Sequence, residues 1–374
     1  MAAEGSTGSE LADRLRIKPR SKVRLSAWNP NDTLGHEKVA AQPVLAHGLE
    51  RLVSLQERLY ASRTTALLVV VQGMDTAGKD GIINHVMSAF NVEGVDVTSF
   101  GVPSPEERAH DYLWRHHLAA PKRGWIGIHN RSHYESVLIE RAEDLTPPAV
   151  WRKRYAQINA WEQELTESGT RIVKFYLHID KDEQRARLQA RLDDPTKQWK
   201  FNPDDLKTRA RWDDYMAAYQ DALEKCSTDA APWYLIPANR KWFARLAVAE
   251  IVAMTMDNLK LDYPKPSFDP KAIVIELAAA AGRRRRAQAT RGRSERLGQH
   301  HPEDQGQPDQ ADDRRPDGFP GGQRPGEVRR HRRFRRHFLA RPGQDRGTQR
   351  PADPRQRSGG ERVHQRRDCE QDDQ

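Results

Sequence analysis

Residues 65–90, from Thr65 to Phe90, read TALLVVVQGMDTAGKDGIINHVMSAF and decide the fold. The apolar run Ala66–Val71 predicts a buried strand, and a glycine-bounded loop of the form GxxxxGK follows it at residues 73–79. After the loop, apolar residues on one helical face predict a helix: Ile82, Ile83, Val86 and Phe90. A strand, such a loop and a helix, in this order, place a phosphate chain at a helix N-terminus.

The loop has the chemistry that phosphate binding requires. Gly73 and Gly78 lack a Cβ, so the backbone can fold tightly around a phosphate. Lys79 adds a full positive charge to the partial charges of the loop amides and the helix dipole. The other loop residues expected to surround the phosphate are Met74, Thr76, Ala77 and Asp80. The alternative is a solvated lysine that only opens a helix, because the GxxxxGK pattern alone is a weak signal.

Two carboxylates distinguish this loop from an ordinary nucleotide-binding loop. Asp80 occupies the position after the lysine, where a Ser or Thr usually holds Mg²⁺, and Asp75 lies inside the loop. Carboxylates are good Mg²⁺ ligands, so we expect Asp75 to hold the metal or orient an acceptor phosphate. The alternative for Asp75 is a plain turn residue.

The charge of the chain is concentrated in its last part. Residues 278–374 contain 24 Arg, no Lys and 15 Asp or Glu, and this tail accounts for the net charge of +9 of the whole 374-residue chain. Its Arg clusters could bind nucleic acid or another polyanion. Its low apolar content predicts a disordered appendage, and its abrupt composition resembles a shifted reading frame in a GC-rich gene. We favour the last two interpretations, so nucleic acid is not an expected partner.

Composition also predicts the compartment. The two cysteines, Cys226 and Cys369, cannot form a disulfide framework and fit a reducing environment. The sequence has no apolar run of transmembrane length, and its first residues lack the apolar core of a signal peptide. A cytoplasmic protein without membrane association is the expectation.

The rest of the chain alternates strands with helices. Residues 1–40 are polar and interrupted by prolines, and they predict an arm wrapped on the domain and disordered at its start. Residues 41–277 are expected to form the domain itself. Strands are predicted at 95–100, 124–128, 171–179 and 233–236, and helices at 41–62, 104–118, 147–167, 181–192, 203–225 and 241–259. This alternation predicts a three-layer α/β fold with a five-stranded parallel sheet and helices on both faces.

A polar cluster follows the third predicted strand, at the sheet edge where such folds bind ligands. It comprises Asn130, Arg131, Ser132, His133, Tyr134 and Glu135. Arg131 is expected to stabilise the charge of a phosphoryl group in the transition state. In the alternative, Ser132 caps a helix and Arg131 is solvated.

Residues 181–211 are rich in cations and are divided by Asp-Asp-Pro-Thr at 193–196. A helix–loop–helix with cations on one side predicts a lid over a polyanion, with Arg187, Arg191, Lys197 and Lys200 among its contacts. The alternative is a solvated charged helix face.

Five motifs in order resemble the polyphosphate kinase 2 family. They are QGMDTAGKDG (72–81), FGVPSPEERAHDYLWR (100–115), HNRSHYE (129–135), RLDDPTKQWKF (191–201) and APWYLIPANRKW (231–242). The resemblance covers about residues 20–277 and implies a P-loop kinase fold related to thymidylate kinase. It also implies that Asp75 and Lys79 are essential, that residues 130–132 correspond to the Walker B region and that residues 181–211 form the lid. Some relatives have Asp in place of Asn130, so the share of this residue in metal binding stays open.

The resemblance implies reversible, Mg²⁺-dependent transfer of the terminal phosphoryl group of inorganic polyphosphate to a nucleotide. His133-Tyr134-Glu135 is similar to the subclass that accepts both AMP and ADP, whereas ADP-preferring members have Trp-Tyr-Asn there. It therefore implies AMP and ADP as acceptors, with Glu135 part of the discrimination. By analogy a dimer or tetramer is expected. The alternatives are an ATP-dependent nucleoside monophosphate kinase on the same fold and a nucleic-acid-binding protein acting through the tail.

Overall fold

A five-stranded sheet forms the centre of the computed structural model, which describes residues 4–270. All strands are parallel, in the order β2-β3-β1-β4-β5. The strands are β1 (Ala66–Gly73), β2 (Val95–Ser99), β3 (Ile126–Asn130), β4 (Thr170–His178) and β5 (Trp233–Pro237). Every residue of β1 is buried, as expected of a central parallel strand covered on both faces. The predicted five-stranded parallel sheet is confirmed.

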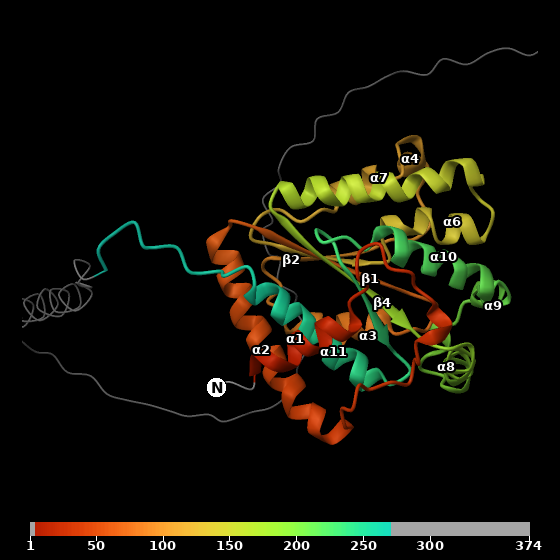
Figure 1. The fold of residues 1–374 in the computed structure, drawn as a ribbon, viewed down its shortest axis with the longest axis horizontal. Helices are drawn as coiled ribbons and strands as arrows, with labels where there is room; N and C mark the ends of the chain where they lie inside the picture. Colours follow the sequence, from red (N-terminus) through yellow and green to blue (C-terminus); the bar gives the residue numbers. More distant parts are fainter. Residues whose placement is uncertain (1–3, 271–374) are drawn as a thin grey trace, which may run out of the picture. The chain divides into compact units, whose positions relative to one another are not determined.

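Helices cover both faces of this sheet and complete the predicted three layers (Figure 1). On one face lie α1 (Glu4–Leu15), α2 (Lys38–Ser62), α3 (Lys79–His85) and α11 (Lys241–Asp257). On the other lie α6 (Ile139–Ala142), α7 (Pro148–Glu167) and α10 (Trp212–Cys226). No helix within residues 4–270 combines the length and apolarity that crossing a bilayer requires. The predicted tail, residues 278–374, lies outside the described residues.

The N-terminal arm is more ordered than its sequence predicted. We expected a disordered segment at its start, but the arm forms the helix α1 from Glu4 on, because Leu11 and Leu15 bury their side chains in the core. The arm then follows the edge of the sheet beside β5. The Ile17 amide donates to the Trp233 carbonyl at 2.9 Å, and the Asn239 amide donates to the Pro30 carbonyl at 3.0 Å.

Two predicted helices are each divided in the structure. The helix predicted at 104–118 is α4 (Pro105–Ala109) and α5 (Trp114–Leu118), and Ser104 caps α4 in a capping box with Glu107. The helix predicted at 203–225 is α9 (Asp204–Ala210) and α10, which are separated by the single residue Arg211, whose φ of −97° and ψ of 28° depart from helical values. The Arg211 guanidinium there donates to Asp214, in the first turn of α10, and to Asp144, from a distant part of the chain.

The sheet directs the functional elements to one edge. The loop after β1, the residues after β3 and α8 (Lys181–Asp193), which follows β4, all begin where parallel strands end. β1 lies between β3 and β4, so its loop opens beside the residues that follow both neighbours. Ligands of open α/β sheets bind at such a point.

Candidate active site

The loop between β1 and α3 depends on its glycines. Gly78 has a φ of 111°, in the left-handed region. At Gly73 a Cβ would lie 2.9 Å from the Leu177 carbonyl oxygen, so no larger residue fits without displacing β4. Thr76 is also left-handed, with a φ of 67°. The predicted strand, loop and helix are therefore observed as one continuous unit.

Lys79 begins α3 and turns its ammonium back onto the loop. Its Nζ donates to the Gly73 carbonyl at 2.7 Å and to the Met74 carbonyl at 3.1 Å. Burial lowers the pKa of Lys79, and the nearby Asp75 carboxylate opposes that shift. An ammonium group has three N–H donors, so one remains for an incoming phosphate oxygen.

Arg131 lies across from the loop and contacts it directly. Its backbone is left-handed, with a φ of 62°, and its amide donates to the Val71 carbonyl at 3.0 Å. The guanidinium donates to Asp75 at 3.1 Å and lies 3.7 Å from the Glu135 carboxylate. Burial alone would lower the pKa of Arg131, but Glu135 and Asp75 together raise it. The structure thus brings together the loop lysine, the loop carboxylate and the predicted arginine.

Gln72, the next-to-last residue of β1, holds the side chains of Ser132 and Glu135 in place by hydrogen bonds. Its amide donates to both side chains, at 3.1 Å in each case. Ser132 caps a 3-10 turn by accepting from the Tyr134 amide at 3.2 Å, so the predicted capping role is observed while Arg131 faces the loop. Burial raises the pKa of Glu135, and the charge of Arg131 opposes the shift.

Asn130 and Asp80 join the end of β3 to the start of α3. The Asn130 amide nitrogen donates to Asp80 at 2.9 Å. Two buried side-chain oxygens, Asn130 Oδ1 at the end of β3 and Thr76 Oγ1 in the loop, have no hydrogen-bond partner. Within residues 4–270, no cluster of three or more His, Cys, Asp or Glu side chains could hold a metal by itself. Mg²⁺ commonly takes one or two carboxylates together with substrate phosphates and water, and the oxygens of this edge fit that pattern.

Arg187 does not serve as a free lid cation. It is 8% exposed, and its guanidinium donates to the loop carbonyls of Thr76 at 2.9 Å and Ala77 at 3.0 Å. It also donates to the carbonyls of Ala238 at 2.6 Å and Asn239 at 3.1 Å. The predicted contact with a bound polyanion is therefore wrong for Arg187. The residue instead holds the phosphate loop in place through the loop carbonyls.

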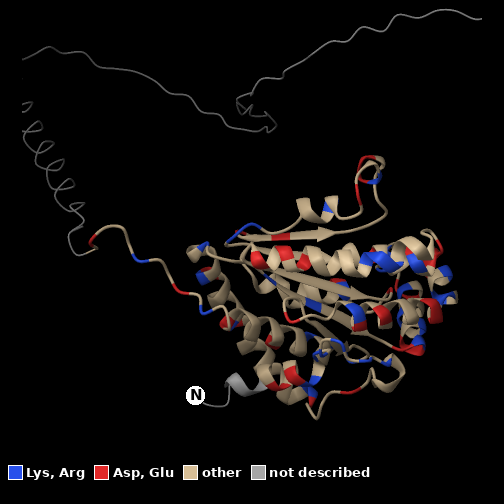
Figure 2. Cartoon of the chain, turned by 45° about the horizontal axis from the view of Figure 1, so that its top comes forward, with Lys and Arg blue, Asp and Glu red and all other residues tan. Residues whose placement is uncertain are grey.

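The remaining predicted lid cations lie on a helix–loop–helix formed by α8, a 3-10 turn (Gln198–Lys200) and α9. Arg191 donates to Asp205 at 3.4 Å, Lys197 pairs with Asp194, and Lys200 lies 5.0 Å from the centroid of the Trp199 ring. In the cartoon of Figure 2, segments coloured for Lys or Arg and segments coloured for Asp or Glu lie close together where α8 and α9 are found. Lys197 is 61% exposed and remains accessible to a ligand.

Sequence reasoning missed Asp205, which lies on α9. Burial, and after it the negative charge of Asp75, raise the pKa of Asp205 to about 6. The Asp205 carboxylate accepts from Arg191 at 3.4 Å, and the charges of Arg131 and Lys79 oppose the rise in its pKa. In the sequence it was indistinguishable from the acidic residues that commonly begin a helix.

Tyr134 is placed differently from its prediction as an acceptor residue. Its side chain is fully buried, and its hydroxyl donates to Glu162 at 2.9 Å and accepts from Lys174 at 2.7 Å. Lys174 in turn pairs with Glu162 at 2.5 Å. Burial and the charge of Glu162 raise the pKa of the Tyr134 hydroxyl. Tyr134 thus belongs to a buried polar network under the site and is not available to a nucleotide.

Comparison with known proteins shows which family the sequence and the fold match. The family described as polyphosphate kinase 2 matches residues 36–264. The chain is 48% identical to an AMP/ADP-polyphosphate phosphotransferase of Meiothermus ruber, over 70% of this chain and 99% of that protein. It is 46% identical to an ADP-polyphosphate phosphotransferase of Rhodopseudomonas palustris, over 67% of this chain and 92% of that protein. The crystal structure of a polyphosphate kinase 2 from Arthrobacter aurescens TC1 matches with a TM-score of 0.69 and 45% identity, covering 73% of this chain and 96% of that chain.

Proposed function

This chain belongs to the polyphosphate kinase 2 family, and we propose that it transfers the terminal phosphoryl group of inorganic polyphosphate to AMP or ADP, reversibly and with Mg²⁺. The observation that carries the proposal is the meeting of Lys79, Asp75 and Arg131 at the carboxyl edge of the sheet. Phosphoryl transfer needs little covalent chemistry from the protein, and positioning with electrostatic stabilisation suffices. This cluster supplies both.

Each residue has a defined task in the proposed reaction. The loop amides and the free N–H of Lys79 hold the oxygens of the transferred phosphoryl group. Arg131 adds positive charge on the equatorial oxygens, where charge shifts in the transition state. Asp75 accepts from Arg131 at 3.1 Å, which fixes the guanidinium before a ligand arrives. No covalent intermediate is required.

Asp75 is the proposed protein ligand of Mg²⁺, with Asp80 and Asn130 supporting it through their mutual hydrogen bond of 2.9 Å. A bound Mg²⁺ would supply charge neutralisation between neighbouring phosphate oxygens. The carboxylate of Asp75 and the unpartnered Asn130 Oδ1 are hard oxygen donors of the kind that this cation prefers.

Glu135 is the proposed determinant of the acceptor. It follows Arg131 in the polar cluster and is fixed by Gln72 at 3.1 Å, so a carboxylate of set orientation lies beside the transfer point. The names of the similar proteins from Meiothermus ruber and Rhodopseudomonas palustris, one citing AMP and ADP and one ADP alone, support acceptance of both.

The direct test is incubation of the protein with polyphosphate, Mg²⁺ and either AMP or ADP. Formation of ADP and ATP without added nucleoside triphosphate is the expected result. If ATP plus a nucleoside monophosphate reacts and polyphosphate does not, the chain is instead an ATP-dependent kinase on the same fold. A variant ending at residue 277 tests the tail, and undiminished turnover is expected because the site lies within residues 4–270.

We also propose that the protein acts in the cytoplasm and forms a dimer or tetramer by analogy with its family. Light scattering coupled to size-exclusion chromatography measures the subunit number directly. A monomer at micromolar concentration is the result that contradicts this analogy.

A further inference from the structure

The arm carries a strictly alternating series of cations. Residues 14–24 read RLRIKPRSKVR, so every second position is Lys or Arg. We call these six side chains the basic stripe: Arg14, Arg16, Lys18, Arg20, Lys22 and Arg24. The stripe lies outside the phosphate loop, the polar cluster and the lid, and the proposed reaction does not use it.

The structure separates the two halves of this alternation. The intervening apolar residues Leu15, Ile17 and Val23 are 5% exposed or less and anchor the arm in the core. Lys18, Arg20, Lys22 and Arg24 are exposed. The arm therefore presents these four cations to solvent, although a turn closed by the Ser21 amide on the Lys18 carbonyl bends it.

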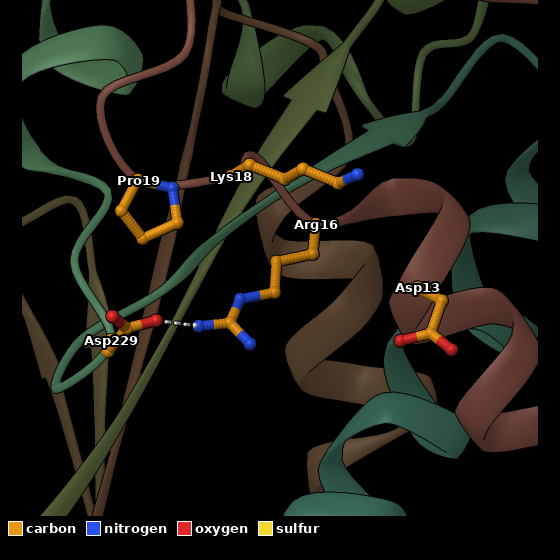
Figure 3. Close-up of a pocket in the computed structure, with 5 residues that line it drawn as sticks. All are labelled: Asp13, Arg16, Lys18, Pro19 and Asp229. Atoms are coloured by element: carbon orange, nitrogen blue, oxygen red, sulfur yellow. Dashed lines mark hydrogen bonds and ion pairs between the residues drawn. The ribbon is translucent and has the colours of Figure 1, made fainter.

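Half of the stripe is neutralised by neighbouring carboxylates. Arg14 pairs with Glu10, Arg16 pairs with Asp229 at 2.8 Å, and Lys22 lies 3.5 Å from Glu224. Figure 3 shows the Arg16–Asp229 pair in a cavity of about 410 Å³, with the Lys18 side chain directed away from that pair. The cavity lining also includes Asp13 and Pro19.

The other half of the stripe is not neutralised. Among contacts between described residues, Lys18, Arg20 and Arg24 form no side-chain ion pair or hydrogen bond. Three exposed cations without carboxylate partners attract a polyanion at low ionic strength.

The stripe leads from the far edge of the sheet toward the active edge. It begins beside the start of β5, where Ile17 donates to Trp233 at 2.9 Å. The arm then follows α10, where the Val23 amide donates to Glu224 at 2.9 Å. It reaches the carboxyl edge at Pro30, which accepts from Asn239 at 3.0 Å.

Asn239 connects the end of this path to the phosphate loop. Its carbonyl accepts from Arg187, the residue that also holds the loop carbonyls of Thr76 and Ala77. Two further cations, Arg240 and Lys241, follow Asn239 directly. The arm therefore continues from the stripe, through residues 25–30, which carry no Lys or Arg, to the backbone that precedes Arg240 and Lys241.

We propose that the basic stripe binds the part of a long polyphosphate chain that extends beyond the transfer site. This inference rests on the proposed use of polyphosphate. A long polyphosphate carries negative charge on every unit, whereas a tripolyphosphate is short enough to be held by the loop and lid alone. The stripe therefore confers preference for long chains and leaves the chemical step unchanged.

The test is the full-length triple variant Lys18→Glu, Arg20→Glu, Arg24→Glu. We expect its KM for long-chain polyphosphate to rise about tenfold at low salt, with a weaker dependence of KM on salt because charge pairing with the polyanion is lost. The KM for tripolyphosphate, the KM for AMP and kcat stay at their wild-type values. The matched control is Lys153→Glu, Lys260→Glu, Lys265→Glu, which makes the same charge change at exposed positions outside the basic stripe.

Two outcomes overturn the inference. In the first, the KM for long chains is unchanged in the arm variant or rises equally in the control. In the second, the KM values for long and short polyphosphate rise together. Anisotropy of end-labelled long polyphosphate, measured with both variants, tests the stripe even if the wild-type protein transfers no phosphoryl group from polyphosphate. Absence of transfer refutes the proposed function, and equal binding by the arm variant and the wild type refutes the stripe.

Discussion

Replacing Arg187 tests whether the phosphate loop is supported from behind. Arg187→Met keeps the length of the side chain and its apolar stem but removes the donors to four carbonyl oxygens, those of Thr76, Ala77, Ala238 and Asn239. At about 1 kcal/mol for each of these four hydrogen bonds, and with the Nε bond to Glu183 lost as well, the free energy of unfolding falls by about 4–5 kcal/mol. A released loop that moves by about 1 Å lowers kcat by about 100-fold.

Urea denaturation followed by circular dichroism measures the stability, and initial rates with saturating polyphosphate measure kcat. Arg185→Met is the matched control, because Arg185 lies on the same helix but is exposed. Its stability should stay within about 0.5 kcal/mol of the wild type. Arg187→Lys keeps the charge. However, one ammonium group has three donors and cannot reach both the phosphate loop and residues 238–239 as the planar guanidinium does, so this variant should not restore kcat. A change of less than about 1 kcal/mol in Arg187→Met, with wild-type kcat, would refute the supporting role.

Three further predictions address the site and the core. Lys79→Ala should reduce kcat below detection while the melting temperature stays near the wild-type value, and a wild-type rate would remove the loop lysine from the mechanism. Lys174→Met leaves the buried Glu162 carboxylate without its cation and should cost about 3–5 kcal/mol of unfolding free energy in urea, whereas Lys153→Met on the exposed face of α7 should cost almost nothing. Asp205 has its pKa raised to about 6 in the folded protein, so its contribution to stability is present below pH 4 and is lost as the pH rises through 6. Asp205→Asn should therefore be more stable than the wild type above pH 6 and lose that advantage below pH 4, and a constant difference across this range contradicts the shift.

The loop could be predicted from the sequence because its requirements are local. An apolar run must be buried, and two glycines around a lysine at the start of a helix leave few other structures. The polar cluster was also placed correctly, since residues that follow parallel strands share one edge. Arg131 and Asp75 meet there as a direct consequence of β1 pairing with β3.

The errors concern residues whose partners come from distant parts of the chain. Arg187 has the sequence neighbours of a solvated helix residue, including Glu183, with which it pairs, and the carbonyls supplied by the loop and by the residues after β5 explain its burial. Tyr134 follows Arg131 closely in the sequence, yet its side chain points into the core toward Glu162 and Lys174. Neither helical periodicity nor motif spacing encodes such pairings, because both describe only neighbours along the chain.

The attachment of α8 limits how the proposed lid can open. Because Arg187 fastens this helix to the loop and to the residues that follow β5, the helix cannot swing as a rigid body about Asp180 without breaking four hydrogen bonds, two of them fully buried. The contacts farther along are weaker or more exposed, such as Arg191 with Asp205 at 3.4 Å and Arg209 with the Lys181 carbonyl. The hinge is thus expected near Asp194, where α8 ends. Residues 194–211 would then be the part of the lid that moves, while the first half of α8 stays in place.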